Sequence, residues 1–164
     1  ATLKAEAVVE RLQISAPTAL VACDSLLEFE GRAHGKPGSA DAAMQRWYRM
    51  RGQSGVLHTG HWLIDTRPAE AGGTRGAVGA TASTVVHFAE IDDAEIDAYV
   101  ATGEPLHVAG GFTIDGLGAP FVESIEGHPS TVIGLCLPLL RRLLADLSAL
   151  RGENVGARAT TMPG

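Results

Sequence analysis

The alternation of apolar and polar residues along the chain predicts helices and strands in mixed order. Helical spacing begins at Leu3 and ends at Leu12. Ser39 can cap a second helix that ends near Arg51, with Met44, Trp47 and Met50 on or near its inner face. Asp92, with an acid three residues later, can cap a third helix that ends at Gly103. A last helix is expected from about Pro138 to Leu150. Segments with strand character are 19–29, a short return strand ending at 36–37, 56–64, 82–91, 111–115 and 120–125.

Glycine and small residues divide these elements. Residues 67–81 are rich in Gly and Ala and predict an exposed, mobile loop, and residues 104–118 predict a glycine-studded loop. Residues 131–135 suggest a short turn, and the polar tail after Gly152 is expected to fray. Without repeats or an internal linker, the pattern predicts an α/β fold. We expect one domain over residues 1–164, with helices flanking a mixed, twisted sheet.

Composition narrows the class of protein. The chain has 164 residues, of which 45% are hydrophobic and 20% charged, and a net charge of −6. This acidic balance argues against a broad nucleic-acid surface, but a small phosphate ligand needs only a few cations. Cys23 and Cys136 form neither a zinc pattern nor a disulfide framework, and they fit a reducing cytoplasm. No apolar run reaches the ~20 residues of a membrane helix, so no membrane partner is expected.

Asp24 is the residue that most needs a chemical explanation, because it interrupts a segment that otherwise predicts a buried strand. Lys36 follows on a stiff turn after Gly35, and an acid near a lysine suits a phosphate site. Asp24 could accept a proton or hold Mg²⁺, with Glu28, Glu30 or Glu104 assisting. The alternative is that Asp24 caps a turn and Lys36 is a solvated surface residue.

His58 and His61 resemble a metal pair, but residues three apart on a strand point to opposite faces. We therefore expect His58 to make a hydrogen bond. Thr59-Gly60 is expected either to let a ligand approach the backbone or to form a bulge.

A set of short motifs recurs in this order in a known family. They are Lys4-Ala5, Cys23-Asp24-Ser25, Gly35-Lys36-Pro37, His58-Thr59-Gly60, Gly103-Glu104-Pro105, Ala109-Gly110-Gly111-Phe112, Gly116-Leu117-Gly118 and Ile133-Gly134-Leu135. With these motifs the chain resembles the Maf-like proteins from Lys4 to about Leu144. The resemblance implies a nucleoside triphosphate pyrophosphatase that uses a divalent cation, Mg²⁺ or Mn²⁺, and clears non-canonical or modified nucleotides.

The resemblance also implies roles for single residues. Asp24 matches the proton acceptor, Ser25 matches a neighbouring hydroxyl position linked to substrate choice, and Lys4 and Lys36 match lysines near the phosphates. Apart from these matches, Asp24 is expected to hold the metal and Thr59 to bind substrate. Asp115 matches a base-selecting position that is usually Gln. The alternatives are a regulator of septum formation that binds nucleotide or protein without turnover, and a different metal-dependent phosphohydrolase. A cytoplasmic protein, which could be a homodimer, is expected.

Three departures from the family pattern qualify these expectations. Nothing before Lys4 supplies the N-terminal strand and phosphate-gripping loop of the family, so we expect that a segment precedes Ala1 in the full protein. His107-Val108 stands where many members carry Asp-Lys, which removes a candidate phosphate contact. A carboxylate at Asp115 only accepts hydrogen bonds, which favours a guanine edge or looser base selection; Asp115 could equally cap the following turn.

Overall fold

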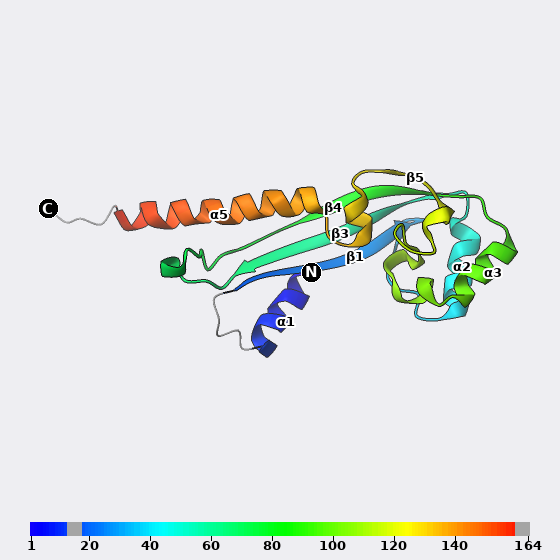
Figure 1. Cartoon of the computed structure of the whole chain (residues 1–164), viewed down its shortest axis with the longest axis horizontal. Coiled ribbons are helices and arrows are strands. Elements are labelled where there is room, and N and C mark those ends of the chain that lie inside the picture. Colours follow the sequence, from blue (N-terminus) through cyan, green and yellow to red (C-terminus); the bar gives the residue numbers. More distant parts are fainter. Residues whose placement is uncertain (13–17, 160–164) are drawn as a thin grey trace. The chain divides into compact units, whose positions relative to one another are not determined.

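A five-stranded sheet organises the chain in a computed structural model that describes residues 1–12 and 18–159 (Figure 1). The strand order is β2-β1-β3-β4-β5, and the pairs β1–β2 and β4–β5 are antiparallel. Hydrogen bonds from Phe88 to Gln53 and from Asp65 to Gly76 show that β3 and β4 also run antiparallel. The strands are β1 (Ala19–Phe29), β2 (Arg32–His34), β3 (Ser54–Asp65), β4 (Ala77–Phe88) and β5 (Val122–Glu126).

Helices fill the connections before, between and after these strands. The α-helices are α1 (Thr2–Leu12), α2 (Ala40–Met50), α3 (Asp93–Ala101), α4 (Pro129–Ile133) and α5 (Leu137–Ala159). Short 3-10 helices cover Ala69–Ala71, Glu104–His107, Ala109–Gly111 and Ala119–Phe121. The expected α/β class is confirmed, although the described strands pair antiparallel where a mixed sheet was expected. In the described part of the chain, no helix has both the length and the apolar character needed to cross a membrane.

The chain divides into two compact units, and β1, β3 and β4 contribute residues to both. The first unit contains Ala1–Asp24, Gly60–Thr81 and Leu137–Gly164. The second unit contains Ser25–Thr59 and Ala82–Cys136.

Aromatic packing forms the core of the second unit. Trp47 is fully buried, and its ring makes edge contacts with Phe88 and Tyr99 at centroid distances of 5.6 and 5.7 Å. Its indole N–H donates to the carbonyl of Gly111 at 2.9 Å, which satisfies the buried polar atom. The predicted inward positions of α2 are confirmed at Trp47 and Met50, both 0% exposed. Helices α2 and α3 pack side by side in this unit (Figure 1).

Both predicted helix caps of the second unit are present. The Ser39 hydroxyl accepts from the amide of Ala42, and Gly52 follows α2 with φ of +66°. Asp92 and Glu95 form a complete capping box, because each side chain accepts from the backbone amide of the other. The starts of α2 and α3 are therefore encoded locally.

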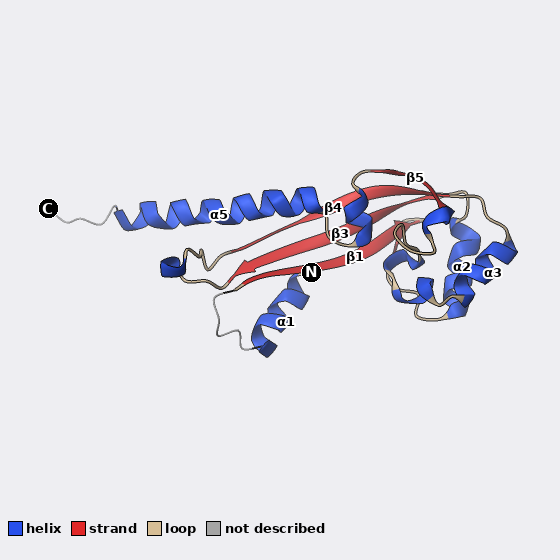
Figure 2. Ribbon diagram, viewed as in Figure 1, coloured by secondary structure: helices blue, strands red, loops and turns tan. Residues whose placement is uncertain are grey.

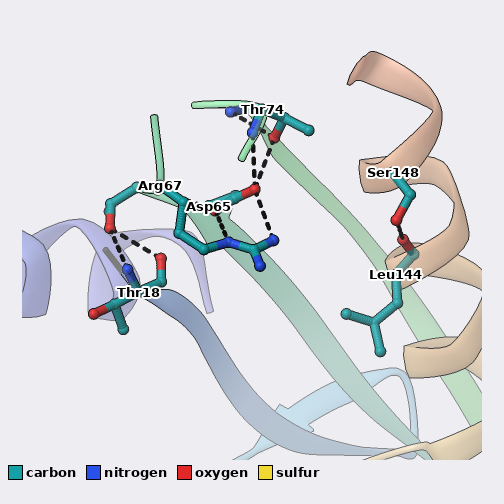
Figure 3. Close-up of polar contacts among 8 residues, drawn as sticks. Thr18, Asp65, Arg67, Thr74, Leu144 and Ser148 are labelled. Atoms are coloured by element: carbon teal, nitrogen blue, oxygen red, sulfur yellow. Dashed lines mark hydrogen bonds and ion pairs between the residues drawn. The ribbon is translucent and has the colours of Figure 1, made fainter. Parts of the chain in front are cut away.

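In the first unit, a buried carboxylate orders the turn between β3 and β4 (Figure 3). The side chain of Asp65 is 0% exposed, and it accepts from Nε of Arg67 at 2.7 Å and from the amide of Thr74 at 2.9 Å. The hydrogen bonds from Arg67 hold the pKa of Asp65 well below its usual range, although burial opposes this shift. The loop expected over 67–81 is shorter than that range, because a 3-10 helix begins at Ala69 and β4 begins at Ala77.

Three expectations about local structure are wrong. No strand forms over 111–115, because this segment consists of a 3-10 helix and turns (Figure 2). The expected turn at 131–135 is largely the short helix α4. The tail that was expected to fray after Gly152 continues α5 to Ala159. In two of these cases, 131–135 and the tail, helix forms where the sequence suggested a turn or a frayed end.

Candidate functional site

Asp24 and Lys4 form an ion pair in the first unit. The Nζ atom of Lys4 on α1 lies 2.6 Å from Oδ1 of Asp24 on β1. The two side chains are 61% and 48% exposed. An ion pair with this exposure adds little to stability, so a charged ligand could exchange with either partner at low cost.

The expectation that Asp24 interrupts a buried strand is wrong. Burial along β1 alternates: Leu27 and Phe29 are buried, whereas Asp24, Leu26 and Glu28 are exposed. Asp24 therefore lies on the solvent-exposed face of a half-buried strand, so its carboxylate is not strongly desolvated. Its position suits a group that meets a ligand from solvent, which keeps the prediction for Asp24 on a different physical ground.

Ser25 and Thr59 form a second group, within the second unit. Their hydroxyl oxygens lie 2.8 Å apart, and the Thr59 hydroxyl donates to the carbonyl of Thr131 at 2.7 Å. Thr59 is fully buried, so its side chain ties β3 to α4. Consecutive residues of a strand leave it on opposite faces, so Asp24 and Ser25 do not point the same way. The structure therefore gives Ser25 and Thr59 a framework contact, and their predicted contact with substrate stays a prediction.

Lys36 stands on a turn that is held from two sides. The carbonyl of Gly35 accepts from Nη1 of Arg46 at 2.7 Å and from the amide of Gly110 at 3.3 Å. The amide of Gly38 donates to the carbonyl of Leu106 at 3.1 Å. Lys36 itself is exposed. A fixed backbone with an exposed ammonium suits the predicted role of a point charge for phosphate.

Glu104 organises the loop that presents Asp115. Its Oε1 accepts from the hydroxyls of Tyr99 and Thr113 at 2.9 and 2.6 Å and from the amide of Gly118 at 2.9 Å. Its Oε2 accepts from the amide of Leu117 at 2.9 Å. Burial by itself would raise the pKa of Glu104, but these hydrogen bonds outweigh it and hold the pKa below its usual value. Glu104 thus acts as an anchor for the loop, which the sequence did not suggest, and Asp115 is exposed on that loop.

His58 makes the hydrogen bonds that its strand position predicted. Its Nδ1 lies 2.8 Å from the hydroxyl of Ser83, and its Nε2 lies 3.0 Å from Oε2 of Glu28. His61 is 2% exposed, whereas the His58 side chain is 36% exposed, so the two rings lie on opposite faces as expected. Within residues 1–12 and 18–159, no group of three or more His, Cys, Asp and Glu side chains could hold a metal ion.

A metal ion at Asp24 would therefore need most of its ligands from outside the protein. Mg²⁺ is commonly bound through one or two carboxylates together with substrate phosphates and waters. One exposed carboxylate fits that mode, since the remaining ligands would be phosphate and water oxygens. The other acids considered for this role already have partners: Glu28 contacts His58, Glu30 lies 3.5 Å from Arg49, and Glu104 holds its loop.

Comparison with known proteins identifies the class to which these motifs belong. The family model described as Maf-like protein matches residues 1–147, and the chain belongs to this family. A protein of Salinispora tropica named nucleoside triphosphate pyrophosphatase is 59% identical over 90% of this chain and 64% of its own length. Proteins with the same name from Streptomyces coelicolor and Leifsonia xyli subsp. xyli are 58% and 53% identical, over 78% and 90% of this chain and 59% and 67% of theirs. The chain thus spans about six tenths of the length of these relatives.

Proposed function

We propose that the protein containing this chain hydrolyses nucleoside triphosphates to monophosphates and pyrophosphate. The observation that carries this proposal is the exposed Lys4–Asp24 pair, in which a carboxylate and an ammonium lie 2.6 Å apart. Membership of the Maf-like family supports it, as do relatives at 48–59% identity that bear the name nucleoside triphosphate pyrophosphatase. Non-canonical or modified nucleotides are the proposed substrates.

In this proposal Asp24 accepts a proton from the attacking water. The water oxygen forms a new bond to phosphorus, the α–β phosphoanhydride bond breaks, and pyrophosphate leaves with the electron pair of that bond. Lys4 and Lys36 would bind phosphate oxygens, where positive charge stabilises the charge that develops during the reaction. A divalent cation, Mg²⁺ or Mn²⁺, would be held by Asp24 and would supply further charge neutralisation.

The choice of base is a separate part of the proposal. Asp115 is exposed on a loop that Glu104 fixes by three hydrogen bonds, so its carboxylate can meet a ligand at a defined position. A carboxylate accepts hydrogen bonds only, which favours the N–H donors of a guanine edge. Ser25 is kept as a second candidate for substrate choice. We further propose a cytoplasmic enzyme, which fits a chain whose two cysteines, Cys23 and Cys136, form no disulfide. A homodimer is also proposed.

Product analysis distinguishes this function from its alternatives. The full-length protein that carries this sequence is incubated with Mg²⁺ and a panel of nucleoside triphosphates, and pyrophosphate and orthophosphate are measured separately. Release of pyrophosphate with the matching monophosphate is expected. Orthophosphate without pyrophosphate would indicate a different phosphohydrolase, and nucleotide binding without either product would indicate a regulator that does not turn over its ligand.

A further inference from the structure

A small basic pocket lies between the end of β2 and the outer side of α2, in the second unit. Its volume is about 210 Å³, and its lining consists of His34, Ala42, Gln45, Arg46 and Arg49. This is smaller than the ~300–1,000 Å³ typical of sites for drug-sized ligands, so a small ligand fits it better. The lining contains two guanidinium groups and no carboxylate, so the chemistry favours an anion.

The two arginines differ in how firmly they are held. Nη1 of Arg46 donates to the carbonyl of Gly35 at 2.7 Å, and this bond uses one of the five N–H donors of the guanidinium. Burial, and then the charge of Arg49, lower the pKa of Arg46. The pocket therefore holds two positive charges close together, and they repel each other. A bound anion would offset this repulsion. Arg49 is 45% exposed and lies 3.5 Å from Glu30, which is too long for a strong hydrogen bond.

His34 supplies an independent sign of a missing partner. Its Nε2 atom is buried and has no hydrogen-bond partner among the described residues. Interaction with the backbone of Phe29 also acts on the ring and raises the pKa of His34. Burial first, and then the charges of Arg46 and Arg49, lower the pKa of His34, while the Phe29 interaction and Glu30 act in the opposite direction. A buried polar atom without a partner is rare in proteins and calls for an explanation.

We propose that this pocket binds a small phosphate-type oxyanion, held by Arg46 and Arg49, with Nε2 of His34 donating to it when the ring is protonated. Guanidinium groups match tetrahedral oxyanions because two N–H donors can bind two oxygens at once. The anion would offset the two arginine charges that disfavour protonation of His34. Binding should therefore take up a proton and be tighter below neutral pH. This site is independent of the proposed hydrolysis and requires no turnover.

The direct test follows the His34 ring by NMR in the full chain during titration with inorganic phosphate, with chloride keeping the ionic strength constant. Saturable shifts with a Kd on the order of 1 mM are expected for a small exposed site. Arg49→Gln should weaken binding roughly tenfold, because one charged hydrogen-bonding group is lost. Arg32→Gln is the matched control, since Arg32 is exposed on β2 and does not line the pocket. A His34 ring that responds to neither phosphate nor pyrophosphate would overturn the proposal, and so would equal weakening in both variants.

Two further arms test the chemistry of the pocket. Pyrophosphate replaces phosphate in a parallel titration: saturation by phosphate itself identifies the free anion, whereas saturation by pyrophosphate alone identifies a condensed phosphate. Gln45→Glu places a carboxylate in the lining and should abolish anion binding. If this variant binds phosphate as tightly as the wild-type protein, the pocket is not the site.

The role of the histidine is tested by comparing Kd at pH 6 and pH 8 in the wild-type protein and in His34→Asn. Because His34→Asn lacks the imidazole ring, its two Kd values show how the protonation of phosphate itself affects binding. The wild-type protein should show a steeper increase in affinity on acidification, and the same slope in both proteins would overturn the assignment of His34.

Discussion

Replacing Glu104 by Gln should destabilise the second unit, because one carboxylate holds four donors there. A glutamine oxygen can replace Oε1, which accepts from Tyr99, Thr113 and Gly118. The amide nitrogen then faces the N–H of Leu117, so one donor loses its acceptor and the remaining bonds lose their charge. An unsatisfied donor together with weaker bonds costs about 2–3 kcal/mol of unfolding free energy.

Urea denaturation followed by the fluorescence of Trp47 and Trp62 measures this cost. Glu123→Gln is the matched control, since Glu123 is exposed on β5, and its change should stay within about 0.5 kcal/mol. The folded-state pKa of Glu104 is lowered, so its contribution is present above the unfolded pKa of about 4.3 and is lost as the pH falls through the folded value. The gap between wild-type and variant protein should therefore shrink below about pH 4. Equal stability of Glu104→Gln and Glu123→Gln at pH 7, or a gap that widens in acid, would show that the charge of Glu104 does not stabilise the loop.

Three further predictions concern other residues. Asp65→Asn should lower Tm by about 4 °C, whereas the control Asp146→Asn on the exposed side of α5 should leave Tm unchanged. Because the pKa of Asp65 is lowered, the difference in Tm between wild type and Asp65→Asn should disappear only in strong acid. A difference that persists in strong acid would contradict this prediction. Lys4→Met should raise KM for the triphosphate about tenfold, and an unchanged KM would remove Lys4 from the phosphate contacts. Asp115→Gln should shift base preference toward uracil or thymine, and an unchanged substrate profile would contradict its role.

The sequence predicted those parts of the fold that depend on local hydrogen bonding and burial. Ser39 and the Asp92–Glu95 pair begin α2 and α3 as expected, because a cap needs only neighbouring residues. Trp47 and Met50 were assigned correctly to the core, since helical periodicity places them on one face.

The errors arose where distant residues decide the structure. The segment after Asp65 appeared irregular because it is rich in glycine, yet a buried carboxylate orders it through Arg67 and Thr74. Glu104 orders the loop that follows it in the same way, and no local pattern marks that role. A carboxylate that binds several backbone amides is visible only once the chain is folded.

The sequence singled out the residues of the candidate site, but it did not predict how they are arranged. The motifs led to Asp24, and the structure adds its contact with Lys4 at 2.6 Å. The strand was expected to be buried, but its burial alternates, so Asp24 is exposed and Ser25 lies on the other side. The sequence of β1 does not reveal this alternation of burial, because the exposed residues Val21 and Leu26 are themselves apolar.

In the proposed hydrolysis, Asp24 accepts a proton from the attacking water. The most direct measurement compares kcat for pyrophosphate formation in the wild-type full-length protein, in Asp24→Asn and in the surface control Asp146→Asn, with Mg²⁺ and saturating nucleotide. General-base catalysis contributes about 10²–10⁴-fold, so Asp24→Asn should lose at least about a hundredfold in kcat while the control keeps its activity. Turnover by Asp24→Asn at the wild-type rate would show that Asp24 is not the proton acceptor.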